Sequence, residues 1–295
     1  MRNIYLCRPF IMFLAIVCTG CSSGINIDFK GGTQGVLDTR TTVVDHVQDA
    51  AVQVESVNGG IKVTQSDRGD VQVIAHVKAR TQERLDATTV SVTRDELNNL
   101  RVGVEWPEGR KNNEGCSFEI ELPDASNVNL RSSNGKITLV GLSGTATLKT
   151  SNGSVRVEGF EGDVKADTSN GSVKIRDVEG LIDADTKNGS IEITEAKHQV
   201  IADTSNGSVH VKLADDDSAG PVEIDTSNGS VTLELNSAFA GKLSCRTSNA
   251  KIRLNGLSGQ VVDDGKRSKK IQFGDSMVES RIKTSNGSIS VTQRD

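Results

Sequence analysis

From residue 126 onward, apolar and polar positions repeat as two short alternating segments on either side of an Asn-Gly pair. Three and five residues after each Asn the chain carries Val, Ile or Leu, as at Val173 and Ile175. Four and six residues before it the positions are also apolar, except for Ser280 in the outer column. Alternation with a period of two is typical of β-strands that bury one face. Each repeat therefore predicts two short strands that meet at the Asn-Gly corner.

The Asn residues of these corners recur at a nearly constant spacing. Successive steps measure 18 residues four times, then 22, 21 and 37 residues. A series of hairpins needs no fixed period, whereas stacking of like residues on like does. The pattern predicts an all-β parallel β-solenoid (β-helix) of about 18-residue rungs. The last and longest step predicts a degenerate rung with Ser268 in the Asn position, followed by Ile271 and Phe273. The corner residues are Asn134, Asn152, Asn170, Asn188, Asn206, Asn228, Asn249 and Asn286.

We interpret this Asn column as structural rather than as a binding motif. The alternation places each Asn on the inward side, in phase with the residue two before it, which is usually Thr. Buried amides about 4.8 Å apart can hydrogen bond to one another as a ladder. The Gly that follows would supply a positive φ at the corner, and only Ala250 departs from it. A second corner recurs as GLSG, GFEG and DVEG.

Residues 31–125 lack the period but still alternate, as in VQVESVNGGIKVTQ and DVQVIAHVKA. Such strands can cover the open edge of the first rung, which would otherwise invite aggregation. We therefore predict an N-terminal β-strand capping region over 31–125 and a solenoid over 126–295. No Pro-, Gly- or Ser-rich linker separates the two parts.

The first residues have the features of a targeting segment. Arg2 and Arg8 precede the apolar run PFIMFLAIVCTG, which is too short to span a bilayer. The stretch CTGCSSG resembles a bacterial lipobox, although Cys18 replaces the usual Leu. We predict a lipoprotein signal peptide over 1–20, a lipidated Cys21, and a tether over 21–30. Ser22 favours the outer membrane by resemblance to the bacterial sorting rule. The alternative is an ordinary secretory signal without lipid.

The repeat stretches IELPDASNVNLRSSNGKI, TSNGSVRV, TSNGSVKI and TSNGSVHV resemble a bacterial family of adhesin-like proteins of unknown function with β-strand repeats. The resemblance covers most of the mature chain. It implies a β-helical fold and a location in the cell envelope. It implies no reaction, and no catalytic residue can be carried over from it.

Composition argues against several classes of function. A net charge of −5 provides no basic field for nucleic acid. Carbohydrate-active β-helices need clustered carboxylates in a cleft lined by aromatic residues. Aromatic residues make up only 3% of this chain, and Trp106 is its single Trp. The four histidines have no metal-ligand spacing, so we expect a non-enzyme without catalytic residues. Cys116 and Cys245 lie too many rungs apart for a disulfide, and Cys245 sits in an apolar column.

One outward column is strongly acidic. Three residues before the corner Asn, four successive repeats carry Asp, and lysine or arginine stands at both ends of the column. We expect a solvated acidic stripe, with Ca²⁺ binding as the alternative because carboxylate oxygens suit that ion. A separate basic stretch, GKRSKK at 265–270, predicts a solvated turn, with contact to anionic lipid or to lipopolysaccharide phosphate as its alternative. The four acidic positions are Asp167, Asp185, Asp203 and Asp225.

Together these features predict a non-catalytic envelope lipoprotein with adhesin-like binding or scaffolding through the solenoid faces. The expected partners are the membrane, through the N-terminal lipid, and an envelope protein or glycan. Two alternatives stay open. One is a carbohydrate-active β-helix enzyme, and the other is a purely structural or stress-related envelope protein.

Overall fold

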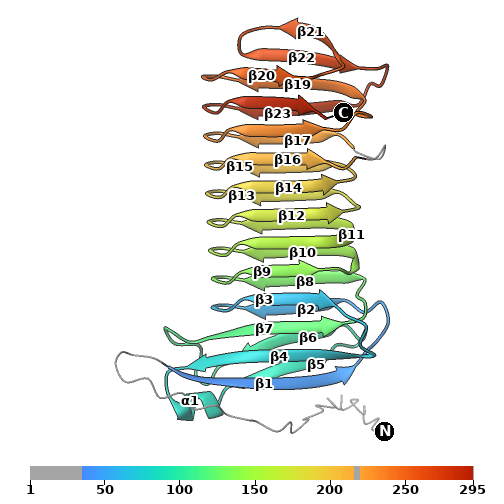
Figure 1. Ribbon diagram of the computed structural model, residues 1–295. Coiled ribbons are helices and arrows are strands. Elements are labelled where there is room, and N and C mark those ends of the chain that lie inside the picture. Colours follow the sequence, from blue (N-terminus) through green and yellow to red (C-terminus); the bar gives the residue numbers. More distant parts are fainter. Residues whose placement is uncertain (1–34, 216–219, 295) are drawn as a thin grey trace, which may run out of the picture.

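The computed structural model describes residues 35–215 and 220–294 and shows a parallel β-solenoid (Figure 1). Its strands form two sheets that face each other across a narrow core. In sheet A, strands pair in the order β1 (Val36–Asp45), β4 (Asp70–Ala79), β7 (Gly115–Leu122), β3 (Ile61–Gln65), β9 (Ile137–Val140), β11 (Val155–Thr168), β12 (Val173–Val178), β14 (Ile191–Ala196), β16 (Val209–Leu213), β18 (Val231–Leu235), β24 (Ile289–Gln293) and β20 (Ile252–Asn255).

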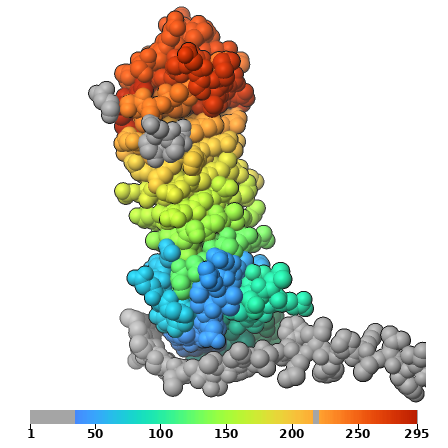
Figure 2. Space-filling view, turned by 90° about the vertical axis from the view of Figure 1, so that its right-hand side faces the viewer, coloured from blue at the N-terminus to red at the C-terminus, as the bar shows by residue number. Residues whose placement is uncertain are grey.

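Sheet B runs alongside and shares β11, which is long enough to contribute to both sheets. Its strands pair in the order β5 (Thr89–Arg94), β6 (Leu100–Glu105), β2 (Val52–Ser56), β8 (Asn127–Ser132), β10 (Ser143–Thr150), β11, β13 (Ile182–Thr186), β15 (Val200–Thr204), β17 (Val222–Thr226), β23 (Glu279–Thr284), β19 (Gly241–Thr247), β22 (Ser268–Phe273) and β21 (Gln260–Asp264). The result is an elongated body with one ridge per rung (Figure 2).

The core is built from the apolar columns that the alternation predicted. Val173 pairs with Ile191, and Ala184 pairs with Ala202, and all four side chains are buried. Burying a Val, Leu or Ile side chain contributes roughly 1.5–3 kcal/mol, and this gain recurs in every rung. Ser280 interrupts its column, but its hydroxyl accepts a hydrogen bond from the backbone N–H of Val222 at 3.0 Å. The polar side chain is thereby tolerated inside the core.

The corner Asn residues form the predicted ladder, but they lie on the surface. Each amide Nδ2 donates to the Oδ1 of the Asn on the neighbouring rung, at distances of 2.6–2.9 Å. All of these Asn residues are exposed, so the inward placement expected from the sequence is wrong. The chain turns away from the core at the corner, which breaks the alternation between the Thr and the Asn. The ladder therefore aligns the rungs at a solvated edge.

A second ladder, made by the Thr two residues before each Asn, lies inside the corner. Thr168 and Thr186 are buried, and their hydroxyls donate at 2.9 Å to the carbonyl oxygens of Gly153 and Gly171 on the preceding rungs. Ser132 makes the same bond to Gly59 at 2.8 Å. These side chains satisfy backbone carbonyls that would otherwise be buried without a partner.

Glycine is required in the Asn-Gly pair because the neighbouring rung leaves no room for a side chain, and not because of its backbone conformation. None of these glycines has a positive φ, which corrects the expectation from the sequence. A methyl group at Gly189 would instead overlap the carbonyl oxygen of Gly171 on the neighbouring rung. The positive φ values occur at the second corner, at Gly141 (+71°), Gly159 (+63°) and Asp177 (+53°).

At the N-terminal end, the stacked rungs begin earlier than the predicted boundary at 125. Strands β2 and β3 pair in parallel with β8 and β9, and Asn58 accepts the hydrogen bond of Asn134. The antiparallel strands β1, β4 and β5 lie beyond this rung (Figure 1). The short helix α1 (Gln82–Asp86) is fixed there by Arg84, whose hydrogen bond to the buried Glu114 lowers the pKa of that carboxyl to about 2. Among the described residues, no helix is long and apolar enough to cross a membrane.

At the C-terminal end, the rungs are stacked out of sequence order. Strand β23 pairs with β17 on one side and with β19 on the other, so the Asn286 rung lies between those of Asn228 and Asn249. Ser268 does not occupy an Asn position, and the predicted degenerate rung is wrong. Ser268 belongs to β22, which runs antiparallel to β19 and forms a hairpin with β21. Phe273 is still buried, with its ring edge-to-face against Phe239 at 5.2 Å.

We expect Gly189→Ala to destabilise the solenoid. The added methyl group meets backbone rather than a movable side chain, and such overpacking costs about 1–3 kcal/mol. Urea unfolding followed by circular dichroism measures the loss. Gly103→Ala is the matched control, because a Cβ at Gly103 meets nothing within 4 Å. Equal effects of the two variants would contradict the spatial role of the corner glycine.

We expect Thr186→Val to cost about 1–3 kcal/mol, because it leaves the Gly171 carbonyl without the hydroxyl donor while preserving side-chain shape. Thr186→Ser keeps the hydroxyl and should retain most of the stability. The same unfolding measurement compares the two. A Val variant as stable as the Ser variant would show that the inner ladder contributes nothing.

Candidate functional site

The outer face of sheet B carries the acidic row as the sequence predicted. Asp167, Asp185, Asp203 and Asp225 are directly paired from strand to strand along β11, β13, β15 and β17. Neighbouring strands lie about 4.8 Å apart, so each carboxylate stands close to the next. The structure therefore brings these four side chains into one line across the stack.

The two ends of the acidic row are neutralised. Lys149 binds Asp167 at 2.9 Å, and Lys283 binds Asp225 at 2.9 Å. The second pair depends on the insertion of β23 beside β17, because sequence order alone would place Arg246 there. The row is thus closed by a cation at each end.

The two central carboxylates, by contrast, make no ion pair or hydrogen bond with another described side chain. Partial burial raises the pKa of Asp185, and the charges of Asp167 and Asp183 raise it further. Partial burial likewise raises the pKa of Asp203, with added repulsion from Asp185 and Asp225. The centre of the row therefore holds negative charge at an energetic cost.

The acidic row does not form a pocket for a cation. Ca²⁺ takes six to eight oxygen ligands that converge on one point, whereas these carboxylates stand along a line. Across residues 35–215 and 220–294, no group of three or more His, Cys, Asp or Glu side chains is placed to hold a metal ion. The geometry gives the calcium alternative no support.

The histidines are scattered over the molecule. His46 bonds to Asp124 at 2.9 Å near the N-terminal end, and His210 bonds to Glu234 at 2.9 Å on sheet A. The two cysteines within the described part of the chain, Cys116 and Cys245, are buried and free, which confirms the core position expected for Cys245. Burial raises the pKa of both Cys116 and Cys245 to about 12. Their thiols stay protonated at neutral pH, and they are therefore poor nucleophiles.

On the outer face of sheet A, most charges in the middle of the stack are paired. Lys174 binds Glu192 at 2.6 Å, and Lys212 binds Glu195 at 2.6 Å. These side chains border a shallow hollow of about 360 Å³. Pairing along this face leaves little charge free for a ligand, with Arg176 as the unpaired exception among the residues that line the hollow.

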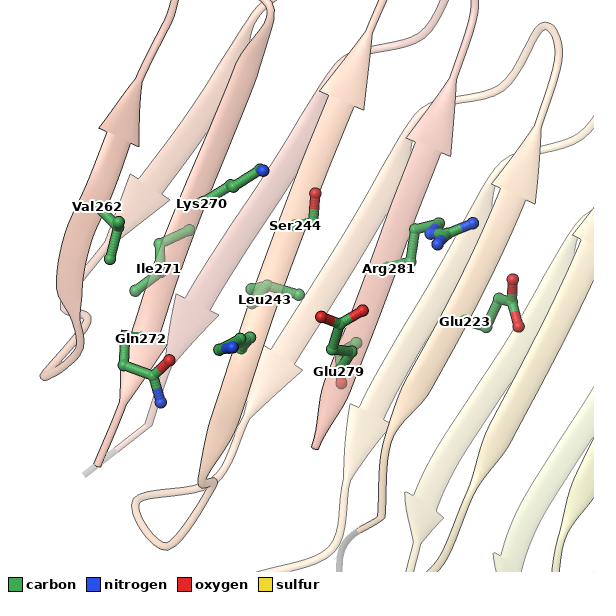
Figure 3. A pocket seen from close by; sticks show the side chains of 11 residues that line it. Glu223, Leu243, Ser244, Val262, Lys270, Ile271, Gln272, Glu279 and Arg281 are labelled. Carbon is green, nitrogen blue, oxygen red and sulfur yellow. The ribbon is translucent and has the colours of Figure 1, made fainter. Parts of the chain in front are cut away.

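A larger hollow of about 500 Å³ lies on the outer face of sheet B near the C-terminal end (Figure 3). It spans β17, β23, β19, β22 and β21. Ser244 lies at its centre, with Arg281 directly opposite on β23 and Lys270 directly opposite on β22. Lys242 stands two residues before Ser244 on the same face of β19. The hollow is thus lined by three cations and by the two carboxylates of Glu223 and Glu279.

No ion pair neutralises these three cations among the described residues. Glu223 is paired in register with Arg281, and Glu279 with Lys242, yet neither carboxylate forms an ion pair with them. Elsewhere on sheet B, Lys149, Lys165 and Lys283 each bind an aspartate on a neighbouring strand. We name Lys242, Lys270 and Arg281 together the cation cluster.

Sequence reasoning missed the cation cluster because it placed Lys270 in a loop and Arg281 at the far end of the stack. In the structure Lys270 lies within a strand that runs antiparallel to β19. The usable signal was the 37-residue step, which is long enough to hold a hairpin as well as a rung.

We expect Asp203→Asn to stabilise the fold at neutral pH. The folded-state pKa of Asp203 is raised, so the native carboxyl holds its proton at a higher pH than the unfolded one. The stability that this proton provides is present in acid and lost as the pH rises through the folded-state pKa. The substitution removes the repulsion between Asp203 and the aspartates on the neighbouring strands, and it should raise the free energy of unfolding by about 0.2–1 kcal/mol. Urea unfolding of variant and parent at about pH 7 and about pH 3 measures this difference, which should vanish in acid.

Asp167→Asn is the matched control for that variant. Asp167 is paired with Lys149, so its replacement removes an attraction along with a repulsion and should give no gain. Equal stabilisation by both variants, or a gain that persists in acid, would contradict the charge-repulsion account.

Three solved structures are similar to this chain. No curated protein matches the sequence. A crystal structure from Bacteroides fragilis, titled a "putative adhesin", is similar with a TM-score of 0.48 and 13% identity, over 87% of this chain and 97% of that one. A Parabacteroides distasonis structure titled a "putative lipid binding protein" gives a TM-score of 0.36 and 12% identity, over 87% and 97% of the two chains. Another from that organism, titled a "putative adhesin", gives 0.31 and 12%, over 88% and 98%.

The family follows from the sequence itself. The profile of the Toastrack DUF4097 family matches residues 48–292, which includes every rung of the stack. The match begins before β2 and ends within β24, so it contains both the early rung of Asn58 and the inserted rung of Asn286. The chain belongs to the Toastrack DUF4097 family.

Proposed function

We propose that this protein is a non-catalytic, adhesin-like envelope protein that binds another envelope component through the outer face of sheet B. The observation that carries the proposal is the unequal pairing of charge on the two faces. On sheet A, Lys174 and Lys212 are neutralised by neighbouring glutamates. On sheet B, Asp185 and Asp203 and the cation cluster have no ion-pair partners among the described residues.

Unpaired charge on a rigid surface is consistent with a role in recognition. The negative charges of Asp185 and Asp203 cost free energy in the isolated protein, as the raised pKa values of these two carboxyls indicate. A ligand of complementary charge would recover that cost on binding. The strand ladders hold the groups at fixed spacing, so little conformational freedom is lost when a partner binds.

We propose that the partner is a glycan or protein of the envelope that carries both amino and acidic groups. The acidic row suits amines, and the adjacent cation cluster suits acidic groups. Both lie on one face, a few strands apart, between β11 and β22. Nothing in this arrangement requires a reaction at the surface.

We further propose that the protein is anchored by a lipid on Cys21, at the outer membrane. This residue and the predicted signal peptide lie outside the described residues, and the proposal is based on the lipobox-like stretch CTGCSSG. The antiparallel strands β1, β4 and β5 at the N-terminal end would then lie nearest the membrane. The hollow near the C-terminal end would lie farthest from it (Figure 1).

Binding is tested with the full chain in detergent on an array of envelope glycans and by titration with purified envelope fractions. We expect saturable binding that falls by roughly tenfold in Asp185→Asn/Asp203→Asn, because each variant removes a charged contact. Lys174→Gln/Lys212→Gln on sheet A should leave binding unchanged. Binding that is insensitive to the sheet B variant would overturn the choice of face.

The anchor is tested separately by membrane fractionation of cells that express the chain. The parent should sediment with the outer membrane and incorporate labelled palmitate, and Cys21→Ser should do neither. Cys18→Ser controls for loss of any cysteine near the cleavage site. A Cys21→Ser chain that still carries label would contradict lipidation at this residue.

A further inference from the structure

We propose that the cation cluster is a binding site for a phosphate monoester carried by a saccharide or a lipid headgroup. This inference rests on the proposed function, because it names the ligand chemistry of one part of the sheet B face. The hollow around Ser244 is lined by three cations without ion pairs among the described residues, and Figure 3 shows Lys270 and Arg281 on the strands on either side of Ser244.

The strand register places two of the cations on either side of Ser244. Arg281 and Lys270 flank Ser244 on adjacent strands, so their backbones are separated by two strand spacings, or about 10 Å. That span leaves room for a tetrahedral anion above Ser244. Lys242 stands two residues before Ser244 on the same face of β19, and the Ser244 hydroxyl can donate a hydrogen bond to the anion.

The choice of phosphate follows from this geometry. A dianion with three free oxygens can accept from Arg281, Lys270 and Lys242 at once, whereas a carboxylate offers two oxygens. Arg and Lys recognise phosphate through charge and hydrogen bonds alone, without acid–base chemistry.

The rest of the hollow indicates what the phosphate is attached to. Its volume of about 500 Å³ exceeds that needed for an inorganic anion. Val262 on β21 borders the hollow with an exposed side chain, and it offers an apolar wall for a sugar ring or a glycerol backbone. Glu223 lies in register beside Arg281, where it can accept from an amino or hydroxyl group of the same ligand.

The cluster differs from three other cations on the outer face of sheet B, which pair with carboxylates of neighbouring strands. Lys149, Lys165 and Lys283 each stabilise the stack by binding an aspartate one strand away. Lys242, Lys270 and Arg281 make no such bond among the described residues. Their charges are therefore available to an anionic ligand.

The test is calorimetric titration of the full chain in detergent with glucose 6-phosphate, and sedimentation with phosphatidic acid vesicles against phosphatidylcholine vesicles. Binding to either phosphate monoester supports the site, and the probe that binds identifies the carrier as saccharide or lipid. We expect Lys270→Gln/Arg281→Gln to weaken that binding at least about tenfold. Ser244→Glu, which places a carboxylate at the centre, should abolish it. Lys174→Gln/Lys212→Gln should bind like the parent, and circular dichroism checks that each variant is folded.

Three results would overturn the proposal: no binding of either probe, undiminished binding by folded Lys270→Gln/Arg281→Gln, or an equal loss in the sheet A control. Its failure is distinguishable from failure of the proposed function. If glycan binding depends on Asp185 and Asp203 while phosphate binding is absent, the phosphate site alone is wrong. If neither ligand binds, both proposals are wrong.

Discussion

The structure depends on the close approach of backbone to backbone at the Asn-Gly corner. At Gly189 a single methyl group would overlap the carbonyl of the rung before it. This proximity allows the Thr186 hydroxyl to donate to that same carbonyl from inside the corner, and the Asn188 amide to donate to Asn170 from outside. Three residue types are therefore required together, for three different reasons: no side chain at Gly, a buried donor at Thr, and a self-complementary amide at Asn. Because this corner fixes the rung spacing, it also fixes every outward row of side chains.

The sequence repeat was sufficient to predict the fold. In a solenoid, equivalent residues of successive rungs stack on one another, so the same residue type recurs at the same position of each repeat. Val173 and Ile191 fall into one buried column by their spacing from the corner Asn alone, and they are paired in the sheet. The repeat could not predict which way the side chains point at the corner itself, because a turn interrupts the strand alternation. For this reason the Asn side chains were predicted to point into the core, whereas they lie on the surface. The repeat also assigned the positive φ to the wrong corner, because the close contact at Gly171 and Gly189 involves a neighbouring rung that local sequence does not specify.

The ends of the stack were harder to predict than its middle, for a physical reason. Inside the solenoid each rung follows the last, so sequence order and spatial order agree. At the ends an exposed strand edge must be covered, and non-local segments provide the cover. Asn58 and Asn286 carry the corner motif, yet only long-range pairing places the first beside Asn134 and the second between Asn228 and Asn249. The candidate acidic row lay within the regular part and was predicted; the cation cluster lay at the irregular end and was not.

The out-of-order rung has a direct consequence for the surface. If β19 followed β17 in sequence order, Ser244 would stand beside Glu223, and Arg281 would lie at the outer edge of the stack. Insertion of β23 instead moves Arg281 between Glu223 and Ser244, and the returning strand β22 places Lys270 on the other side. The same insertion neutralises Asp225 with Lys283 and so ends the acidic row. One change in stacking order thus separates an acidic surface from a basic one on a single sheet, which is the arrangement that a ligand with both amino and phosphate groups requires.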